Sequence, residues 1–277
     1  MKLGQYNELR VTRDSDYGLY LADTEGNEVL LPRRYVSDDM QPGSELRVFV
    51  YRDSEDRPVA TTEIPYATVG QFAFLEVSDV NSTGAFLDWG LTGKQLLVPF
   101  SEQRVRMARG GIYPVYIYLD HATGRVVASG KLDRFTGNVP PAYRARQRVE
   151  CLVLEHTPIG YRTIVDNLHR GMIYSSETYT PLEVGQTVTA YVKHVRPDGK
   201  IDLTLAGPQA DRTAALAARI AEAARAAGGR LALGDASSPE EIRLAFSCSK
   251  KDFKRALGHL YKEGTATLGP DSVTLTR

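Results

Sequence analysis

Cysteine and tryptophan are scarce in this chain of 277 residues, which has two cysteines and one tryptophan. Cys151 and Cys248 lie far apart and lack metal-ligand spacing, so we expect neither a disulfide framework nor a zinc site. Every apolar run is much shorter than the roughly 20 residues that cross a bilayer. The N-terminal Met1 to Gly4 leads into polar sequence without the apolar core of a signal peptide. The sequence therefore predicts a cytoplasmic protein that does not enter a membrane.

Signals for catalysis are also missing from the sequence. The five histidines are scattered without HExxH spacing, and there is no nucleophile elbow and no glycine-rich phosphate loop followed by Lys-Ser or Lys-Thr. Asp198 and Asp202 bracket a hairpin turn, where solvated carboxylates are the usual finding. We therefore expect no enzymatic activity, no metal, no cofactor and no small-molecule substrate.

Net charge is zero overall, but it is unevenly distributed. Residues 1–65 carry 8 basic and 13 acidic side chains, a net charge of −5, whereas residues 212–277 carry 11 and 7, a net charge of +4. The two central segments, 66–140 and 141–211, are close to neutral. An anionic partner should be attracted most strongly to the C-terminal end. The acidic first segment is the poorest candidate for phosphate contact.

The chain contains one pattern three times. A glycine-led phrase begins at Gly18, Gly84 and Gly160, so the pattern recurs after 66 and then 76 residues. Each copy continues with a second short phrase, a glycine-containing turn and a longer apolar run. This period is too long for a solenoid unit and suits a small complete domain.

Short strands separated by turn signals are expected within each repeat. In the second repeat we expect five strands: Gln71–Asp79, Ala85–Trp89, Gln95–Val98, Ile112–Leu119 and Val126–Leu132. A polar stretch, Ser101–Ala108, joins the third strand to the fourth. Five strands with a long link at this point indicate a five-stranded Greek-key OB-fold barrel. The third repeat ends in the same way, with Thr187–Val195, a turn and Lys200–Leu205.

The pattern changes to helices after Gly207. An alanine-rich helix is expected over Arg212–Ala227, with Leu216, Ile220, Ala223 and Ala227 on its apolar stripe. Capping boxes at Ser238 and Ser249 open two more helices, of which the second runs to Glu263. Strands over Thr265–Leu268 and Ser272–Thr276 follow and complete the order of a winged helix-turn-helix.

The predicted fold class is therefore mainly β with an α+β C-terminus: three tandem five-stranded OB-fold barrels followed by a winged helix-turn-helix domain. The expected domains are module one at 1–65, module two at 66–136, module three at 142–207 and the winged-helix domain at 211–277.

An OB-fold barrel can bind unpaired bases on aromatic side chains of its second and third strands, while cations follow the phosphates. Module two offers three aromatic and two basic candidates for such a site: Phe86, Trp89, Phe100, Arg104 and Arg106. Module three offers six candidates: Tyr161, Arg162, His169, Tyr174, Lys193 and Arg196. An aromatic residue in an alternating strand is also a common barrel-core residue, so the grouping is more informative than any single position.

The third helix of the last domain has a basic face. Phe253, Ala256, Leu257, Leu260 and Tyr261 have the spacing of a core-facing stripe. The basic candidates lie on roughly the opposite side: Lys251, Lys254, Arg255 and Lys262. Such a helix can lie along phosphates or in a groove, or it can present a solvated lysine face to a partner protein. Only Arg255 could read a base edge, which argues against sequence-specific reading of a duplex.

The three modules resemble the RNA-binding OB repeat of ribosomal protein S1, and the whole chain, 1–277, resembles the conserved virulence factor B (CvfB) family. The stretches that carry the second resemblance are Val192–Leu203 and Ser249–Gly258. The resemblance implies RNA binding and control of gene expression in a bacterial protein.

Departures from the S1 pattern distinguish the modules. Its strand-two phenylalanine is Phe86 in module two, Tyr20 in module one and Arg162 in module three. The histidine that follows its third strand is replaced by Pro32, Pro99 and Tyr174. These changes favour a structural or protein-contact role for module one.

We expect the chain to bind single-stranded RNA through the later barrels and the basic C-terminal domain. Two alternatives stay open: a duplex-DNA-binding regulator led by the winged helix, and an interaction scaffold on the ribosome or RNA polymerase.

Overall fold

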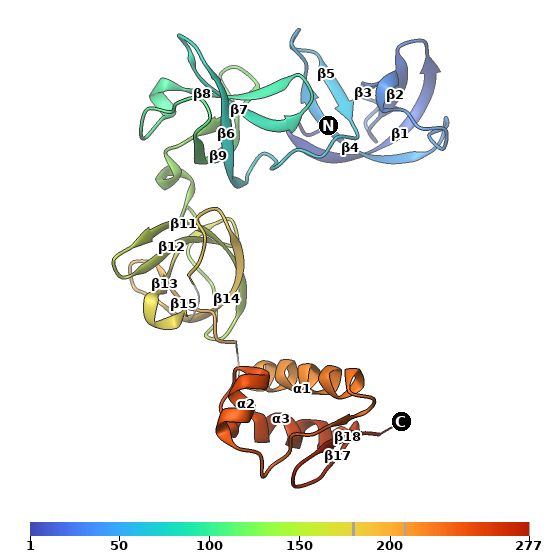
Figure 1. The fold of residues 1–277 in the computed structure, drawn as a ribbon. Helices are drawn as coiled ribbons and strands as arrows, with labels where there is room; N and C mark the ends of the chain where they lie inside the picture. The colour runs from blue at the N-terminus through green and yellow to red at the C-terminus, as the bar shows by residue number, and fades with distance from the viewer. Residues whose placement is uncertain (179–180, 208, 277) are drawn as a thin grey trace.

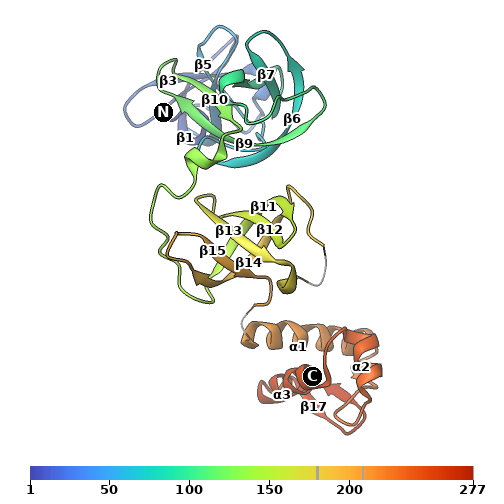
Figure 2. The same ribbon diagram turned by 90° about the vertical axis from the view of Figure 1, so that its left-hand side faces the viewer.

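The structure, a computed structural model, describes residues 1–178, 181–207 and 209–276. Figure 1 shows three β-barrels and a small helical domain, which lies at the far end of the molecule from the first two barrels. The third barrel lies between them, as the turned view in Figure 2 also shows. The predicted fold class is confirmed. In the described part of the chain, no helix has the length and apolar character needed to span a bilayer.

The three barrels share one strand order. The first consists of β1 (Gln5–Ser15), β2 (Gly18–Ala22), β3 (Glu28–Pro32), β4 (Glu45–Arg52) and β5 (Pro58–Thr61). The second consists of β6 (Phe72–Val80), β7 (Gly84–Leu91), β8 (Lys94–Pro99), β9 (Ile112–Asp120) and β10 (Arg125–Ser129). The third consists of β11 (Arg148–Thr157), β12 (Gly160–Val165), β13 (His169–Tyr174), β14 (Thr187–Val195) and β15 (Ile201–Thr204). Barrels one and three close through a parallel pairing of their third and fifth strands, whereas the ladder of barrel two stays open between β8 and β10.

A 3-10 helix follows the third strand of every barrel: η1 (Arg33–Tyr35), η2 (Phe100–Glu102) and η4 (Ser175–Glu177). A further one, η3 (Leu132–Phe135), follows β10. The strand predicted over Val126–Leu132 therefore ends earlier, at Ser129.

A β-bulge lies at the same place in the first strand of each barrel, where the register shifts between Val11 and Arg13, between Val77 and Asp79, and between Val153 and Glu155. A bulge bends its strand and increases the local twist. It also sets which side chains of the first and second strands face outward beyond that point.

The leading glycine of each repeat begins the second strand against the backbone of the third. A β-carbon at Gly18, Gly84 or Gly160 would lie 2.1 to 2.2 Å from a carbonyl oxygen of that strand. No side chain fits in this space without separating the two strands. The repeated glycine is therefore a requirement of the barrel itself.

A second repeated position precedes each barrel. Gly4, Gly70 and Arg146 all have a left-handed backbone, with φ of 69°, 90° and 68°. Their N–H groups donate to the carbonyls of Val50, Ile117 and Val192, at 2.7, 2.8 and 2.7 Å. The left-handed conformation costs a non-glycine residue about 1–2 kcal/mol. Barrel three alone has a side chain at this position.

Barrels one and two are fused through a shared core. Phe49 of β4 packs edge to face on Trp89 of β7, with ring centroids 5.4 Å apart, in a cluster that draws residues from both barrels. The indole N–H of Trp89 donates to the carbonyl of Ala67 in the link between the barrels, at 2.7 Å. Arg125 pairs with Asp56 across the junction at 2.8 Å. The two barrels therefore form one packed unit.

Barrel three is held to barrel two by Asn167 in the turn between β12 and β13. Its side-chain oxygen accepts from the N–H of Phe72 at 2.8 Å, and its amide nitrogen donates to the carbonyl of Gly70. Arg170 pairs with Asp133 at 2.9 Å. The side chain of Asn167 thus satisfies the backbone at the start of β6 as a neighbouring strand would.

The last domain contains α1 (Gln209–Ala226), β16 (Arg230–Leu231), α2 (Pro239–Phe246), α3 (Lys250–Lys262), β17 (Ala266–Leu268) and β18 (Val273–Leu275). The capping box at Ser238 is present, and Ser249 caps α3 by accepting from the N–H of Asp252. Its core contains Leu216, Ile220, Phe253 and Leu260. Ala227, predicted to lie on the apolar stripe of the first helix, is exposed and lies beyond α1, and the two-residue strand β16 was not predicted.

The close approach at Gly84 gives a test of the barrel fold. We expect Gly84→Ala to destabilise the fused unit of barrels one and two by about 3 kcal/mol, because the new methyl group collides with the carbonyl of Val98. Unfolding is followed in denaturant by the fluorescence of Trp89, the chain's single tryptophan. Gly93→Ala is the control, since its β-carbon meets nothing within 4 Å and only its φ of 72° is unfavourable, which costs about 1 kcal/mol. Equal effects of the two variants would contradict the steric explanation.

Candidate nucleic-acid interface

One outward-facing pair occupies the same place in all three barrels, directly after the bulge. Residue pairs join the first and second strands there: Arg13 with Tyr20, Asp79 with Phe86, and Glu155 with Arg162. These positions include the one that holds the S1 phenylalanine. The three barrels therefore present different chemistry at an equivalent site.

In barrel one a cation covers the aromatic ring. The guanidinium carbon of Arg13 lies 3.4 Å from the ring centroid of Tyr20, and Arg13 also pairs with Glu28 at 3.3 Å. A base could stack on this face of Tyr20 only by displacing the arginine. This geometry agrees with the expectation that module one contributes least to base stacking.

In barrel two the aromatic ring of Phe86 is half-buried on the outer face of β7, opposite Asp79. Phe100 begins η2 at the end of β8, and the guanidinium carbon of Arg106 lies 3.4 Å from its ring centroid. Arg104 and Arg106 are both exposed in the link that follows. The structure thus places an aromatic ring on the second strand of this barrel and a cation–aromatic pair directly after the third strand.

In barrel three the outward pair is an ion pair and contains no aromatic ring. Arg162 pairs with Glu155 at 2.7 Å. Arg196 donates to Asp202 at 2.9 Å and also contacts the hydroxyl of Tyr174, and the carboxylate of Asp202 raises the pKa of Arg196 above its usual value. Tyr174 is half-buried, and Lys193 is exposed on β14.

Three of the aromatic candidates are buried, so their rings are not open to a base. Trp89 is 0% exposed in the shared core, Tyr161 is 7% exposed, and His169 is 3% exposed. The hydroxyl of Tyr161 accepts from the N–H of Leu182 at 3.2 Å. The prediction of these three as base-contacting residues does not fit the structure.

Both ring nitrogens of His169 have hydrogen-bond partners in the segment before β11. Its Nε2 donates to the carbonyl of Val139 at 2.6 Å, and its Nδ1 lies 3.0 Å from the hydroxyl of Tyr143. A carbonyl oxygen can only accept, so Nε2 carries the hydrogen of that bond. Burial raises the pKa of Tyr143 to about 12, so its hydroxyl keeps its proton at neutral pH. His169 therefore fastens the segment before β11 to the barrel.

The basic residues of α3 lie on its exposed face. Lys254 pairs with Asp235 at 2.9 Å, and Arg255 lies 3.4 Å from Asp252. Lys251 and Lys262 are exposed as well. Tyr261, predicted to be in the core, is 65% exposed. It lies eight residues after Phe253, about 80° from it around the helix, at the edge of the buried stripe, so α3 presents an aromatic ring beside its lysines.

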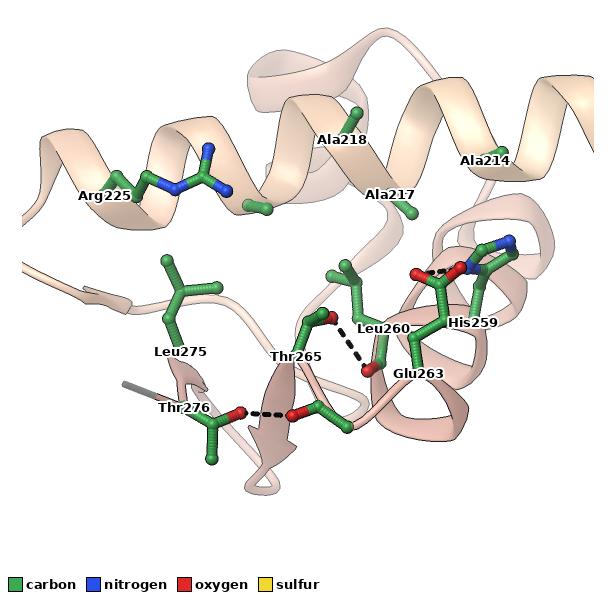
Figure 3. Close-up of a pocket in the computed structure, with 12 residues that line it drawn as sticks. Ala214, Ala217, Ala218, Arg225, His259, Leu260, Glu263, Thr265, Leu275 and Thr276 are labelled. Carbon is green, nitrogen blue, oxygen red and sulfur yellow. Dashed lines mark hydrogen bonds and ion pairs between the residues drawn. The ribbon is translucent and has the colours of Figure 1, made fainter.

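A cavity of about 510 Å³ lies between α1 and α3 in the same domain (Figure 3). Four alanines of α1 line one side of it, and two of its polar side chains lie near local partners: His259 is 3.2 Å from Glu263, and Thr265 donates to the carbonyl of Leu260 at 3.0 Å. None of the four basic candidates of α3 lines it. This cavity is separate from the basic face.

The described residues include no group of three or more histidine, cysteine or acidic side chains able to hold a metal ion. Asp198 and Asp202 pair with Lys200 and Arg196, at 2.8 Å each. Burial raises the pKa of the Cys151 thiol to about 12. At neutral pH Cys151 is therefore a neutral core residue, unsuited as a nucleophile or metal ligand.

Tandem OB-fold barrels with outward aromatic and basic side chains, followed by a winged helix with a basic third helix, define a class of protein built from nucleic-acid-binding domains. The S1 domain family model matches residues 3–63 and 69–131, and the CvfB-like winged helix domain model matches residues 218–275. The uncharacterized protein YitL of Bacillus subtilis is 30% identical over 274 residues, which cover 95% of this chain and 90% of YitL. The chain belongs to the conserved virulence factor B (CvfB) family.

Conserved virulence factor B of Staphylococcus aureus strain N315 is 25% identical over 264 residues, covering 91% of this chain and 87% of that protein. A solved structure from Streptococcus pneumoniae TIGR4, described as a multidomain protein with nucleic acid binding domains, matches 99% of this chain and 98% of its own at 23% identity. Its TM-score is 0.41.

The structural role of His169 can be tested by truncation. We expect His169→Ala to destabilise barrel three by about 3 kcal/mol, since the Val139 carbonyl and the Tyr143 hydroxyl lose their buried partner. Hydrogen exchange in the peptides of β12 and β13 measures the change. His194→Ala, on the exposed side of β14, should change stability by less than about 0.5 kcal/mol. Equal protection in the two variants would contradict a structural role for His169.

Proposed function

We propose that the chain is a cytoplasmic protein that binds single-stranded RNA through barrels two and three and the basic face of α3, and that it acts in the control of gene expression. The observation that carries the proposal is the outward pair after the bulge: in barrel two it presents Phe86 on β7, and the Phe100–Arg106 pair follows the neighbouring strand β8, all within the stretch that matches the S1 domain model. A phenylalanine face on the second strand of an OB fold suits stacking on an unpaired base. The family also supports this proposal, because S1 and winged-helix domains are nucleic-acid-binding domains.

Charge supports a division of roles between the ends of the chain. The first barrel lies in the acidic segment, and its ring at Tyr20 is covered by Arg13. The basic residues of α3 lie in the segment with net charge +4. Barrel one therefore serves to support barrel two through the shared core, and the strand of RNA runs from barrel two toward α3.

Phe86 gives the first test of this function. We expect Phe86→Ala to weaken binding of an unstructured RNA by about tenfold, since one base stack is worth roughly 1–3 kcal/mol. Tyr20→Ala removes the aromatic ring from the equivalent position of barrel one and is the matched control, for which we expect less than a twofold change. Fluorescence anisotropy at fixed salt measures both. A larger loss for Tyr20→Ala than for Phe86→Ala would contradict the assignment.

The kind of nucleic acid that the protein binds is tested by measuring the affinity of the unaltered protein for unstructured RNA, duplex RNA and duplex DNA over a series of salt concentrations. We expect the tightest binding to unpaired RNA, with a modest salt slope because few phosphates are contacted. Tighter binding to duplex DNA, lost in the double variant Lys251→Glu and Arg255→Glu, would instead support a DNA-binding regulator. Co-purification with ribosomes or RNA polymerase that survives ribonuclease, without affinity for free RNA, would support a scaffold.

A further inference from the structure

Arg146 is the unusual member of a repeated set. Gly4, Gly70 and Arg146 have the same spacing, 66 and 76 residues, as the leading glycines, and a glutamine follows each of them. All three make the same backbone hydrogen bond in the same left-handed conformation. Barrels one and two use glycine, which adopts this conformation without strain. An arginine in this backbone conformation lowers the stability of barrel three, which suggests that its side chain has a function.

Arg146 lines a cavity of about 460 Å³ at the junction of barrel three and α1. Lys193 of β14 and Arg212 of α1 line the same cavity, together with Tyr191, Thr204 and Gly207. Its size lies within the range of about 300–1,000 Å³ that is usual for small-ligand sites. Three cationic residues from three separate segments therefore surround one cavity.

None of the described residues that line the cavity is acidic. Arg146 is exposed and has no ion pair with any carboxylate among the residues that the structure describes, whereas Arg162, Arg170 and Arg196 of the same barrel each have one. The guanidinium of Arg146 is thus available to an external anion.

The wall of the cavity is fixed by packing. Tyr191 lies against the backbone of Gly207, where a β-carbon would come within 2.9 Å of the ring. The N–H of Arg146 donates to the carbonyl of Val192, the residue beside both Tyr191 and Lys193. This bond ties the arginine directly to the strand that carries the lysine. The backbones that carry Arg146 and Lys193 are therefore held near one another before any ligand binds.

We propose that this cavity binds a phosphate group of the RNA backbone where the strand passes from barrel three to the winged helix, with Arg146 as its main ligand. The proposal rests on the proposed function and adds a site to it. Guanidinium groups bind phosphate oxygens through paired N–H donors, and an arginine is the natural choice for this contact. The site lies off the aromatic surface of the second and third strands and reads no base.

Arg146→Gly tests the site without endangering the fold. The substitution removes the guanidinium and places at this position the residue that barrels one and two already use there. We expect the full-length variant to bind an unstructured RNA about tenfold more weakly, as loss of a charge-assisted hydrogen bond requires. The slope of log affinity against log salt should fall by about 0.7, the value for one phosphate contact on a single strand. The melting temperature should stay the same or rise.

Arg144→Ala is the matched control, because Arg144 is an exposed arginine of the same segment that does not line the cavity. It should change affinity by less than twofold. A second RNA with neutral methylphosphonate linkages should bind wild type and Arg146→Gly equally, since it offers no phosphate charge. Equal binding of native RNA by wild type and Arg146→Gly would overturn the site and leave the proposed function standing. Failure of the wild type itself to bind RNA would overturn both.

Discussion

Each barrel depends on one close backbone approach. The first residue of the second strand lies so near a carbonyl of the third strand that only glycine fits, at Gly18, Gly84 and Gly160 alike. This approach fixes the register of the second and third strands, and the bulge of the first strand fixes which residues beyond it face outward. Because the glycine and the bulge fix the backbone, the side chains of the outward pair can differ from one barrel to the next. The same frame therefore presents arginine over tyrosine, phenylalanine beside aspartate, or an arginine–glutamate ion pair.

Repetition increases affinity only when the modules are held in a geometry that one strand of RNA can follow. The shared core around Phe49 and Trp89 removes freedom between barrels one and two, and Asn167 fastens barrel three to the start of β6. Barrel one, whose ring is covered and whose segment is acidic, then has a physical use without contacting RNA. It completes the core on which barrel two depends.

The sequence was sufficient for the fold because its signals are local or periodic. The capping box at Ser238 determines structure within a few residues, whereas the repeat spacing and the long link after the third strand identify a barrel that occurs three times. The base-contacting candidates were less predictable because grouping residues by type ignored the alternation of a strand. Phe86 faces outward, so Trp89, three residues later, must face inward. Likewise Arg162 and Tyr174 face outward, whereas Tyr161 and His169 are buried. Strict alternation within each strand would have separated them.

Arg146 stands out only when the three repeats are compared with one another. Nothing in its own segment, Arg144 to Arg148, distinguishes it from its arginine neighbours in the sequence. Its meaning comes from superposing the repeats, where the two other modules have glycine at the same position and the backbone is left-handed in all three. Sequences that fold well agree with local preferences nearly everywhere, and they depart from them mainly where function requires a particular side chain. In a repeat protein one module therefore serves as the control for another: the glycines of modules one and two show what the fold requires, and the arginine of module three shows what has been added to it.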